Sequence, residues 1–426
     1  LGAPYRSCCM GDDGMKIVIA PGKLAGAIPL PSSKSQTHRA LLAASLGHGV
    51  STLRGITLSQ DIEATLSCLR ALGAGVVDRG NTLEICGIGG RTRALRTGIP
   101  QLDCGESGST LRFLIPIALA LLGGGEFTGR GRLMKRPLNP YFQLFERRGI
   151  AYRLKDGILR VQGTLSPGRY ELPGNVSSQF ITGLLFALPL LAGDSELVLT
   201  SPLESRDYVK MTLDILEKYG IQLENRADTG FVIPGGQQFE ARDWTVERDW
   251  SQGAFWYAAN FLGGQVELPG LNSASVQGDK EIATDYRRLS QSGDVELNVS
   301  QCPDLVPPLA AMAAVRAGTT RLNHAARLRL KESDRLSSVT RALNVMGARV
   351  KEGPDSLIIH GVKQLPGGGT VDCCRDHRIA MMAAVSAAFA QKPVTLLGAE
   401  CVHKSYPQFW LHFQMLGGKI HGLILR

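Results

Sequence analysis

Six short segments of the chain combine small polar residues with charged ones at the beginning of an apolar stretch. They read SSKSQTHR, CGESGSTLR, NVSSQF, ERDWSQG, QCPDL and CRDHR. Ser, Asp and Gly commonly cap the free N–H groups of a helix start, and for any single segment that explanation is the better one. Six helix starts that face one another would instead form an anion-binding region, because each positive dipole end favours an anion by roughly 0.3–1 kcal/mol.

Cationic side chains accompany these segments. Lys34 and Arg39 flank the first segment, Arg112 lies in the second, and Arg378 lies in the last. Planar guanidinium groups bind phosphates and carboxylates through paired hydrogen bonds. The chemistry indicated is the binding of small anionic molecules.

The segment RLRLKESDRL leaves two explanations open. It places Lys331 and Arg335 four residues apart, where like charges repel each other on a helix. One explanation is a solvated face on which Glu332 and Asp334 offset the charge. The other is an anion held between the two cations.

The composition limits the class of protein. A chain of 426 residues exceeds what one hydrophobic core usually organises, so two domains are expected. The formal net charge of +9 is compatible with nucleic acid, an anionic membrane or acidic small molecules. The basic residues do not form runs and only 6% of residues are aromatic, so small anions are favoured over a polyanion.

The cysteines, the apolar runs and the beginning of the chain limit the class of protein further. The nine cysteines include no Cys-x-x-Cys, so neither a metal site nor a disulfide framework is indicated, and reduced thiols fit the cytoplasm. The apolar runs 114–122 and 379–390 are too short to span a membrane. Residues 1–14 lack an initiating Met, and we expect them to be a leader ahead of a start at Met15.

The elements that would position the polar segments repeat along the chain. Each segment leads into a helix that is apolar nearly all round and is therefore expected to be buried. These helices begin near Ser35, Ser107, Ser178, Ser251, Asp304 and His377, with spacings of 72, 71, 73, 53 and 73 residues. Between them lie amphipathic helices that end in Gly73, Gly149, Gly220, Gly293, Gly347 and Gly417, with spacings of 76, 71, 73, 54 and 70.

Both series shorten at the same repeat, which indicates a single unit used six times. Each unit supplies one inner helix, one outer helix and strands. Three such units make a domain of about 200 residues, a usual domain size. The expected fold class is therefore α/β, with two similar domains.

The motifs, in their order and spacing, resemble those of the 5-enolpyruvylshikimate-3-phosphate synthase family from about Ile17 to the C-terminus. LPSSKSQTHRAL is similar to a Lys-Ser-x-x-x-Arg element of that family, and CGESGSTLR is similar to its Gly-rich phosphoenolpyruvate loop. Arg136-Pro137, VSSQF, LKESDRL, DHRIAM and CVHKSYPQF match further signatures. Each motif alone is weak, but seven of them in order are specific.

The resemblance implies two domains, each of three βαβαββ units with buried helices, in an inside-out α/β barrel. The active site would lie in the interdomain cleft, and the chain would cross between the domains near 30–33 and 246–249. One domain would comprise residues 1–31 and 248–426, and the other residues 32–247. We expect a cytoplasmic monomer that acts on small molecules, without a nucleic-acid or membrane partner.

The activity that the resemblance implies is that of a 3-phosphoshikimate 1-carboxyvinyltransferase of the shikimate pathway of aromatic amino acid biosynthesis. Such an enzyme moves the enolpyruvyl group of phosphoenolpyruvate to the 5-hydroxyl of shikimate 3-phosphate and needs no metal or organic cofactor. The residues carried over for shikimate 3-phosphate are Lys34, Ser35, Arg39, Ser177, Ser178, Gln179, Ser205, Tyr208, Asp304 and Lys331. Those carried over for phosphoenolpyruvate are Lys34, Gly108, Arg136, Gln179, Arg335, Arg378 and Lys404.

The resemblance also implies an addition followed by an elimination. Asp304 would accept the proton of the attacking hydroxyl, and Glu332, with Lys34 nearby, would exchange the proton at the methylene carbon of phosphoenolpyruvate. These three residues could also share or exchange their roles. His377 would be structural, or would orient Arg378.

Two departures from the family pattern affect substrate contacts rather than the fold. Glu106 and Ser107 stand where Asn followed by Ala or Ser is commoner. Arg327 stands where an Asn often contacts the sugar-like ligand. Gly108 leaves the space that glyphosate, which mimics phosphoenolpyruvate, would need, so the sequence predicts sensitivity to it.

Two other functions share features with this sequence. A UDP-N-acetylglucosamine enolpyruvyl transferase would share the fold, but it has Asn after the first Lys, where Ser35 follows Lys34 here. An inactive basic relative that binds nucleic acid would not need the acids Asp304 and Glu332.

Overall fold

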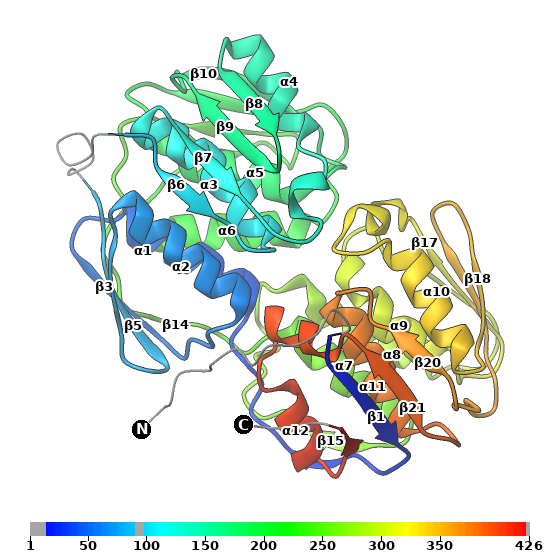
Figure 1. Ribbon diagram of the computed structural model, residues 1–426. Coiled ribbons are helices and arrows are strands. Elements are labelled where there is room, and N and C mark those ends of the chain that lie inside the picture. Colours follow the sequence, from blue (N-terminus) through cyan, green and yellow to red (C-terminus); the bar gives the residue numbers. More distant parts are fainter. Residues whose placement is uncertain (1–13, 90–97, 423–426) are drawn as a thin grey trace.

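The computed structural model describes residues 14–89 and 98–422 (Figure 1). The leader expected at 1–14 lies, except for Gly14, outside the described residues. The described chain forms two lobes, each with its own cluster of buried apolar side chains. One cluster takes its members from residues 17–30 and 250–416, and the other from residues 40–246.

The chain passes between the two clusters twice, and the two passages lie side by side. The N–H of Ser33 donates to the carbonyl of Glu247 at 2.8 Å, and the N–H of Asp249 donates to the carbonyl of Pro31 at 3.0 Å. The passages lie at the residues where the sequence predicts the crossings. The domain limits at 31/32 and 247/248 stay a prediction.

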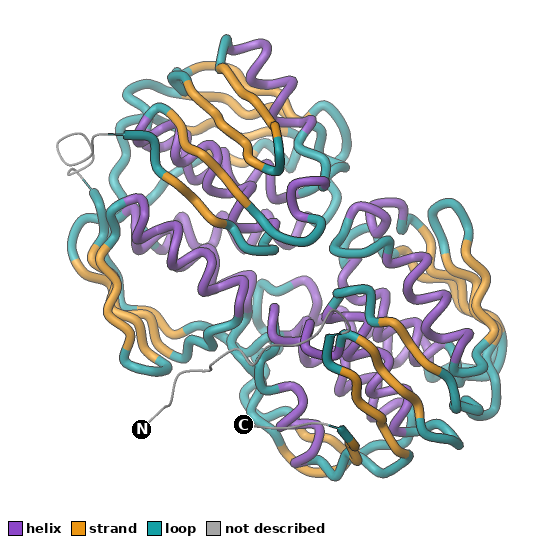
Figure 2. Tube along the Cα trace, in the orientation of Figure 1, coloured by secondary structure: helices purple, strands orange, loops and turns teal. Residues whose placement is uncertain are grey.

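Six helices lie inside the lobes, and nearly every residue in them is buried. They are α1 (Lys34–Leu46), α3 (Gly108–Leu122) and α5 (Ser178–Ala187) in one lobe, and α7 (Trp250–Phe261), α9 (Val306–Ala313) and α11 (His377–Ala388) in the other. Figure 2 shows strands on the outside of the lobes and helices within. The prediction of all-round apolar, buried helices is confirmed, and each begins within two residues of its predicted start.

A second set of helices is only half-buried. It comprises α2 (Gln60–Leu72), α4 (Asn139–Arg148), α6 (Arg206–Lys218), α8 (Ile282–Leu289), α10 (Arg335–Val345) and α12 (Phe409–Met415). The predicted glycine that follows each of them has a positive φ, between 64° and 110°. Glycine adopts this left-handed conformation without strain, which suits it to the turn after a helix; Gly293 lies four residues beyond the end of α8, and the other five lie within two residues of a helix end.

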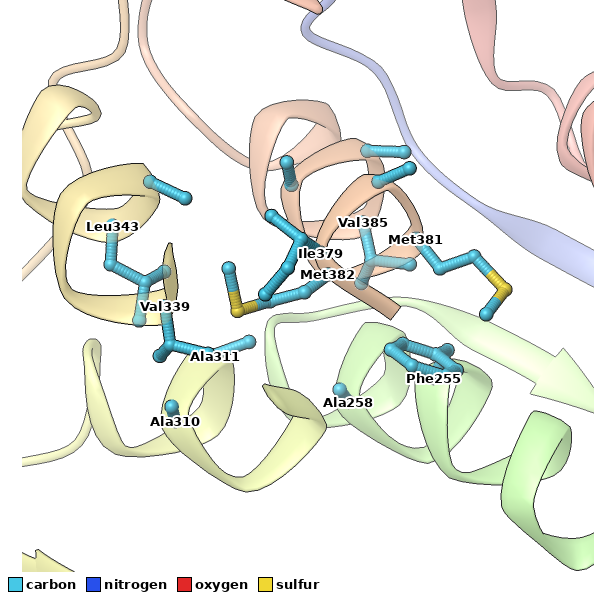
Figure 3. Close-up of a cluster of buried hydrophobic side chains, with 14 of the residues drawn as sticks. Phe255, Ala258, Ala310, Ala311, Val339, Leu343, Ile379, Met381, Met382 and Val385 are labelled. Carbon is cyan, nitrogen blue, oxygen red and sulfur yellow. The ribbon is translucent and has the colours of Figure 1, made fainter. Parts of the chain in front are cut away.

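The inner helices pack through small and flexible apolar side chains. Figure 3 shows Phe255 of α7, Ala310 of α9 and Met382 of α11 in one cluster, with Val339 and Leu343 of α10 at its side. Alanine permits close approach between helices, and methionine fills the irregular gaps that remain. In the parts of the chain that the structure describes, no helix combines the length and apolar character needed to cross a membrane.

In the part of the chain that the structure describes, six sheets cover the inner helices, one for each repeat unit. Their strand orders are β14-β3-β5-β4, β6-β7-β9-β8, β10-β11-β13-β12, β15-β2, β16-β17-β19-β18 and β20-β21-β1-β22. In each four-stranded sheet the first two strands are parallel and the other pairings are antiparallel. This pattern is the βαβαββ unit, in which two strand–helix steps end in a hairpin.

The strands run from residue 16 to residue 421. Their bounds are β1 (Lys16–Ala20), β2 (Ala25–Ala27), β3 (Val50–Arg54), β4 (Gly75–Asp78), β5 (Thr82–Cys86), β6 (Gln101–Asp103), β7 (Gly124–Thr128), β8 (Ala151–Lys155), β9 (Ile158–Gln162), β10 (Gly168–Leu172), β11 (Ser195–Leu199), β12 (Glu224–Asn225), β13 (Gly230–Ile233), β14 (Trp244–Thr245), β15 (Gln265–Glu267), β16 (Val295–Asn298), β17 (Thr319–Asn323), β18 (Arg349–Glu352), β19 (Leu357–His360), β20 (Thr370–Asp372), β21 (Val394–Leu397) and β22 (Lys419–His421). The N-terminal strand β1 completes the last unit, with Ile17 opposite Leu396.

One unit departs from the expected βαβαββ pattern, and this departure explains the short repeat. After α8 the chain goes directly to β16 of the next unit, without the antiparallel strand pair that closes the other units. The sheet of this unit therefore has two strands instead of four. The missing strand pair accounts for the spacing of 53 residues between inner helix starts, against 71 to 73 elsewhere.

Candidate active site

One pocket receives the beginnings of all six inner helices. Its lining includes Lys34 and Ser35 of α1, Gly108 and Ser109 of α3, Ser178 and Gln179 of α5, Ser251 and Gln252 of α7, Asp304 just ahead of α9, and His377 and Arg378 of α11. Three of these helices belong to one apolar cluster and three to the other, so the pocket lies between the lobes. The predicted convergence of helix starts is thus present in the structure.

The beginning of α1 is tied to the other lobe by Asp249. Its carboxylate accepts from the backbone N–H of Lys34 at 2.9 Å and from that of Gln252, in α7, also at 2.9 Å. One carboxylate therefore caps two helices at once. The Lys34 ammonium donates to Asp61 at 2.7 Å, which holds it at the pocket wall.

The Gly-rich loop brings α3 close to two guanidinium groups. A Cβ on Gly108 would lie 2.5 Å from Nη1 of Arg136 and 3.1 Å from Nη1 of Arg112. Arg112 in turn donates to Gln179 at 2.7 Å, and the amide of Gln179 donates to Ser109 at 2.9 Å. Only glycine at 108 leaves these groups where they are, so the loop is built around a cationic wall.

Asp304 lies at the centre of three cations. Its carboxylate accepts from Arg335 at 2.8 Å, Arg378 at 3.1 Å and Lys331 at 3.2 Å. Burial alone would raise the pKa of Asp304, but Arg378, Lys331 and Arg335 hold that pKa well below its usual range. Asp304 is therefore ionised at neutral pH.

The structure decides between the two explanations for the spacing of Lys331 and Arg335. The helix α10 begins only at Arg335, so the two cations do not lie on one helix face. Arg335 is 1% exposed, which excludes a solvated face. The anion between the two cations in this structure is the carboxylate of Asp304.

Glu332 lies beside this cluster. It accepts from Arg335 at 2.6 Å and lies 3.9 Å from Arg136, which comes from the other lobe. Burial would raise the pKa of Glu332, but Arg335 and Arg136 lower it well below its usual range. Burial, with Lys34 and Arg378 nearby, also lowers the pKa of His377, so its imidazole is neutral.

Arg39 and Tyr208 form the inner wall of the pocket. The guanidinium of Arg39 is 2% exposed and donates to Thr212 at 2.9 Å and to the carbonyl of Tyr208 at 3.0 Å. Burial lowers its pKa to about 10, so it stays cationic. The hydroxyl of Tyr208 lies 3.3 Å from Asp304.

All but one of the predicted site residues line this pocket; the exception is Lys404. The Lys404 ammonium donates to Glu106 at 2.5 Å and to the carbonyl of Arg375 at 2.7 Å. Since Glu106 belongs to the Gly-rich loop of the other lobe, this ion pair bridges the two lobes.

Comparison with known proteins assigns the family. The EPSP synthase (3-phosphoshikimate 1-carboxyvinyltransferase) profile matches residues 18–413. Relatives named 3-phosphoshikimate 1-carboxyvinyltransferase from Clostridium kluyveri and Clostridium beijerinckii are 45% and 43% identical, covering 95% and 94% of this chain and 98% and 97% of their own lengths. The chain belongs to the EPSP synthase family.

A solved structure agrees with the fold of this family member. The EPSP synthase of Acinetobacter baumannii superposes with a TM-score of 0.78 at 22% sequence identity, covering 96% of this chain and 100% of that one. At that identity the likeness supports the fold: α/β, with two similar lobes.

Several pocket residues of this EPSP synthase family member were not predicted from the sequence to be in the site. Asp61 and Ser109 line the pocket, and Asp249 ties its two sides together. The polar segment ERDWSQG carried a signal for Asp249, which was explained there as a cap. No spacing in the sequence pointed to Asp61, because its contact with Lys34 depends on how α1 and α2 pack.

The two departures from the family pattern each have a partner in the structure. Glu106 pairs with Lys404, as described above. Arg327 pairs with Glu204 and donates to the hydroxyl of Ser205 at 3.0 Å. Both unusual residues therefore contact residues that the sequence assigns to substrate binding.

Proposed function

We propose that this EPSP synthase family member transfers the enolpyruvyl group of phosphoenolpyruvate to the 5-hydroxyl of shikimate 3-phosphate and releases phosphate. The observation that carries the proposal is the charge of the pocket, whose lining holds eight Lys and Arg side chains but four Asp and Glu. Two substrates that each bear a phosphate and a carboxylate would offset this surplus. The names of the curated relatives agree with the reaction.

Shikimate 3-phosphate would bind to the wall formed by α1, α5 and α6. We assign its phosphate to Ser177, Ser178, Ser205 and Lys331, its carboxylate to Ser35 and Arg39, and its ring to Gln179 and Tyr208. The free N–H groups at the start of α5 support the phosphate position. The contact between Lys331 and Asp304 supports a ring hydroxyl within reach of Asp304.

Phosphoenolpyruvate would bind across the cleft. We assign its phosphate to Lys34, the backbone of Gly108, Arg136, Gln179 and Lys404, and its carboxylate to Arg335 and Arg378. In the structure both of these guanidinium groups hold the carboxylate of Asp304, so they are already oriented towards such a group. The close approach of Arg136 to Gly108 supports a phosphate at the start of α3.

The charges of the pocket residues suggest which group accepts and which group donates each proton. Asp304 is ionised and would accept the proton of the attacking hydroxyl as its oxygen bonds to C2 of phosphoenolpyruvate. Lys34 would protonate the methylene carbon in this addition step. Glu332, whose pKa is held low, would remove a proton from the resulting methyl group as phosphate leaves, while the cations stabilise the departing charge.

The test is phosphate release from phosphoenolpyruvate with shikimate 3-phosphate or UDP-N-acetylglucosamine as the acceptor. We expect release with shikimate 3-phosphate alone, and a loss of at least about 10²-fold in Asp304→Ala and Glu332→Ala. Release only with the nucleotide sugar would move the function to the sister transferase. Folded protein that is silent with both acceptors would contradict the proposal.

A further inference from the structure

A second buried carboxylate lies behind the proposed base. Asp279 belongs to the 3-10 turn η3 (Gly278–Glu281) and is 4% exposed. Its Oδ2 accepts from the hydroxyl of Tyr208 at 3.1 Å, and its Oδ1 has no hydrogen-bond partner of good geometry among the described residues, although the nearby hydroxyl of Ser251 lowers the pKa of Asp279 slightly. Asp279 also forms no ion pair with any of the described residues. A buried carboxylate with so little compensation is costly, which calls for an explanation.

Tyr208 joins Asp279 to Asp304. Its hydroxyl oxygen lies 3.1 Å from Asp279 and 3.3 Å from Asp304, so three oxygens form a chain. A tyrosine hydroxyl has one hydrogen and can donate to only one of the two carboxylates. Because three cations already offset the charge of Asp304 and no ion pair offsets that of Asp279, Asp279 is the better acceptor for this hydrogen. The contact with Asp304 then lacks a hydrogen until Asp304 itself takes up a proton.

The surroundings of the two carboxylates differ in charge. Three cations contact Asp304 directly, and none of them contacts Asp279. The groups that face Asp279 are Tyr208 of α6, Asp304 and the nearby thiol of Cys302, Asp249 and Ser251 at the start of α7, and Arg378 of α11. Burial and Asp304 raise the pKa of Asp279 to about 6, with Arg378 opposing them. A proton is therefore held more readily at Asp279 than at Asp304.

We infer that Tyr208 and Asp279 form a relay that carries the hydroxyl proton of the acceptor substrate away from Asp304. When Asp304 takes that proton, it donates it to the oxygen of Tyr208, and Tyr208 gives its own hydrogen to Asp279. One proton moves in total, and Asp304 regains the charge that holds Lys331, Arg335 and Arg378. The proton returns along the same chain when phosphate leaves, because the released phosphate carries one additional O–H.

This inference rests on the proposed function, since it takes Asp304 as the group that meets the hydroxyl. Asp279 does not touch the substrate and acts through Tyr208. The relay requires Asp279 to be ionised before it accepts the proton. Turnover should therefore fall as the pH drops through about 6, where Asp279 becomes protonated.

The test compares Asp279→Asn, Tyr208→Phe and the double variant with the parent enzyme. Phosphate release with saturating substrates is measured from pH 5 to pH 9, and binding of shikimate 3-phosphate is measured by calorimetry. We expect Asp279→Asn to lower kcat by about 10²-fold. The Kd for shikimate 3-phosphate should stay within about threefold of the parental value. The pH profile of kcat should lose its fall near pH 6. The double variant should be no slower than the slower single variant, because both changes break one chain.

The matched control is Asp285→Asn. Asp285 of α8 is also buried, and burial and Glu281 raise its pKa to about 6 as well, but it pairs with Arg288 and does not line the pocket. We expect this variant to keep both the parental kcat and its fall near pH 6. The relay would be overturned if the fall of kcat near pH 6 persisted in Asp279→Asn. It would also be overturned if the kcat loss in the double variant equalled the product of the losses in the single variants.

The outcomes separate the relay from the proposed function. A parent enzyme that releases no phosphate with shikimate 3-phosphate contradicts the function itself. An active parent whose Asp304→Asn variant is inactive, with Asp279→Asn behaving as the parent does, removes only the relay. If Asp279→Asn does not fold, Tyr208→Phe interrupts the same chain and decides the question through its pH profile.

Discussion

At the scale of single residues, the most unusual feature of the site is the ion pair between Glu106 and Lys404. The ammonium is 7% exposed and the carboxylate 30%, so the pair is only partly screened by water. We assign Lys404 to the phosphate of phosphoenolpyruvate, and Glu106 would compete with that phosphate for the same ammonium. The departure from the family pattern at Glu106 should thus weaken the binding of phosphoenolpyruvate.

Replacing Glu106 by Gln should relieve this competition. We expect Glu106→Gln to lower KM for phosphoenolpyruvate by about threefold to tenfold, the effect of roughly 0.7–1.4 kcal/mol. The measurement is KM for phosphoenolpyruvate at saturating shikimate 3-phosphate. Glu63→Gln removes an exposed carboxylate from the same lobe and should change nothing. An unchanged or higher KM in Glu106→Gln would contradict the competition.

A methyl group at position 108 should damage the phosphate site. In Gly108→Ala the added Cβ would lie 2.5 Å from a nitrogen of Arg136, so the guanidinium must move. We expect KM for phosphoenolpyruvate and the inhibition constant for glyphosate to rise at least about tenfold, or 1.4 kcal/mol. The Kd for shikimate 3-phosphate should stay the same. Inhibition by glyphosate as strong as in the parent would contradict this assignment of the loop.

At the scale of elements, the sequence predicted the helix starts well and their connections poorly. Serine, glycine and aspartate ahead of apolar stretches are local signals, and they placed the starts of α1, α3 and α5 to within one residue. The absent strand pair after α8 was visible only as a short spacing. The partnership of Asp279 with Tyr208 had no signal, because it joins residues 71 positions apart in different lobes.

Asp249 gives an element-scale test of how the two lobes are joined. Its carboxylate caps α7 and also accepts from the N–H of Lys34 at the start of α1. In Asp249→Ala both N–H groups lose their partner, and we expect the free energy of unfolding to fall by about 1–4 kcal/mol, twice the effect of one cap. Denaturation by urea measures this loss.

The matched control for that experiment is Ser107→Ala. The hydroxyl of Ser107 accepts from the N–H of Thr110 at 3.2 Å and caps α3 alone. We expect this variant to lose about 0.5–2 kcal/mol, the ordinary value for one cap. Equal losses in the two variants would show that the hydrogen bond from the N–H of Lys34 to Asp249 adds no stability.

At the scale of the whole molecule, the two lobes present the pocket with matching positive charge. Lys34, Arg39, Arg112 and Arg136 line it from one lobe, and Arg327, Lys331, Arg335 and Arg378 line it from the other. Like charges across a partly desolvated cleft repel each other, and anions between them remove the repulsion. The lobes are joined by two short passages of chain and by a few contacts across the cleft, among them Lys404 with Glu106 and the N–H of Lys34 with Asp249.

Binding of both anions should therefore draw the lobes together. We expect the radius of gyration in small-angle X-ray scattering to decrease when shikimate 3-phosphate and glyphosate are added, and to decrease less when shikimate 3-phosphate is added alone. Unphosphorylated shikimate serves as the control ligand, since it keeps the carboxylate but lacks the phosphate that is assigned to residues of both lobes. A scattering profile that saturating ligands leave unchanged would mean that the contacts of Asp249 and Lys404 already hold the lobes closed, and that the cationic walls act only on the substrates.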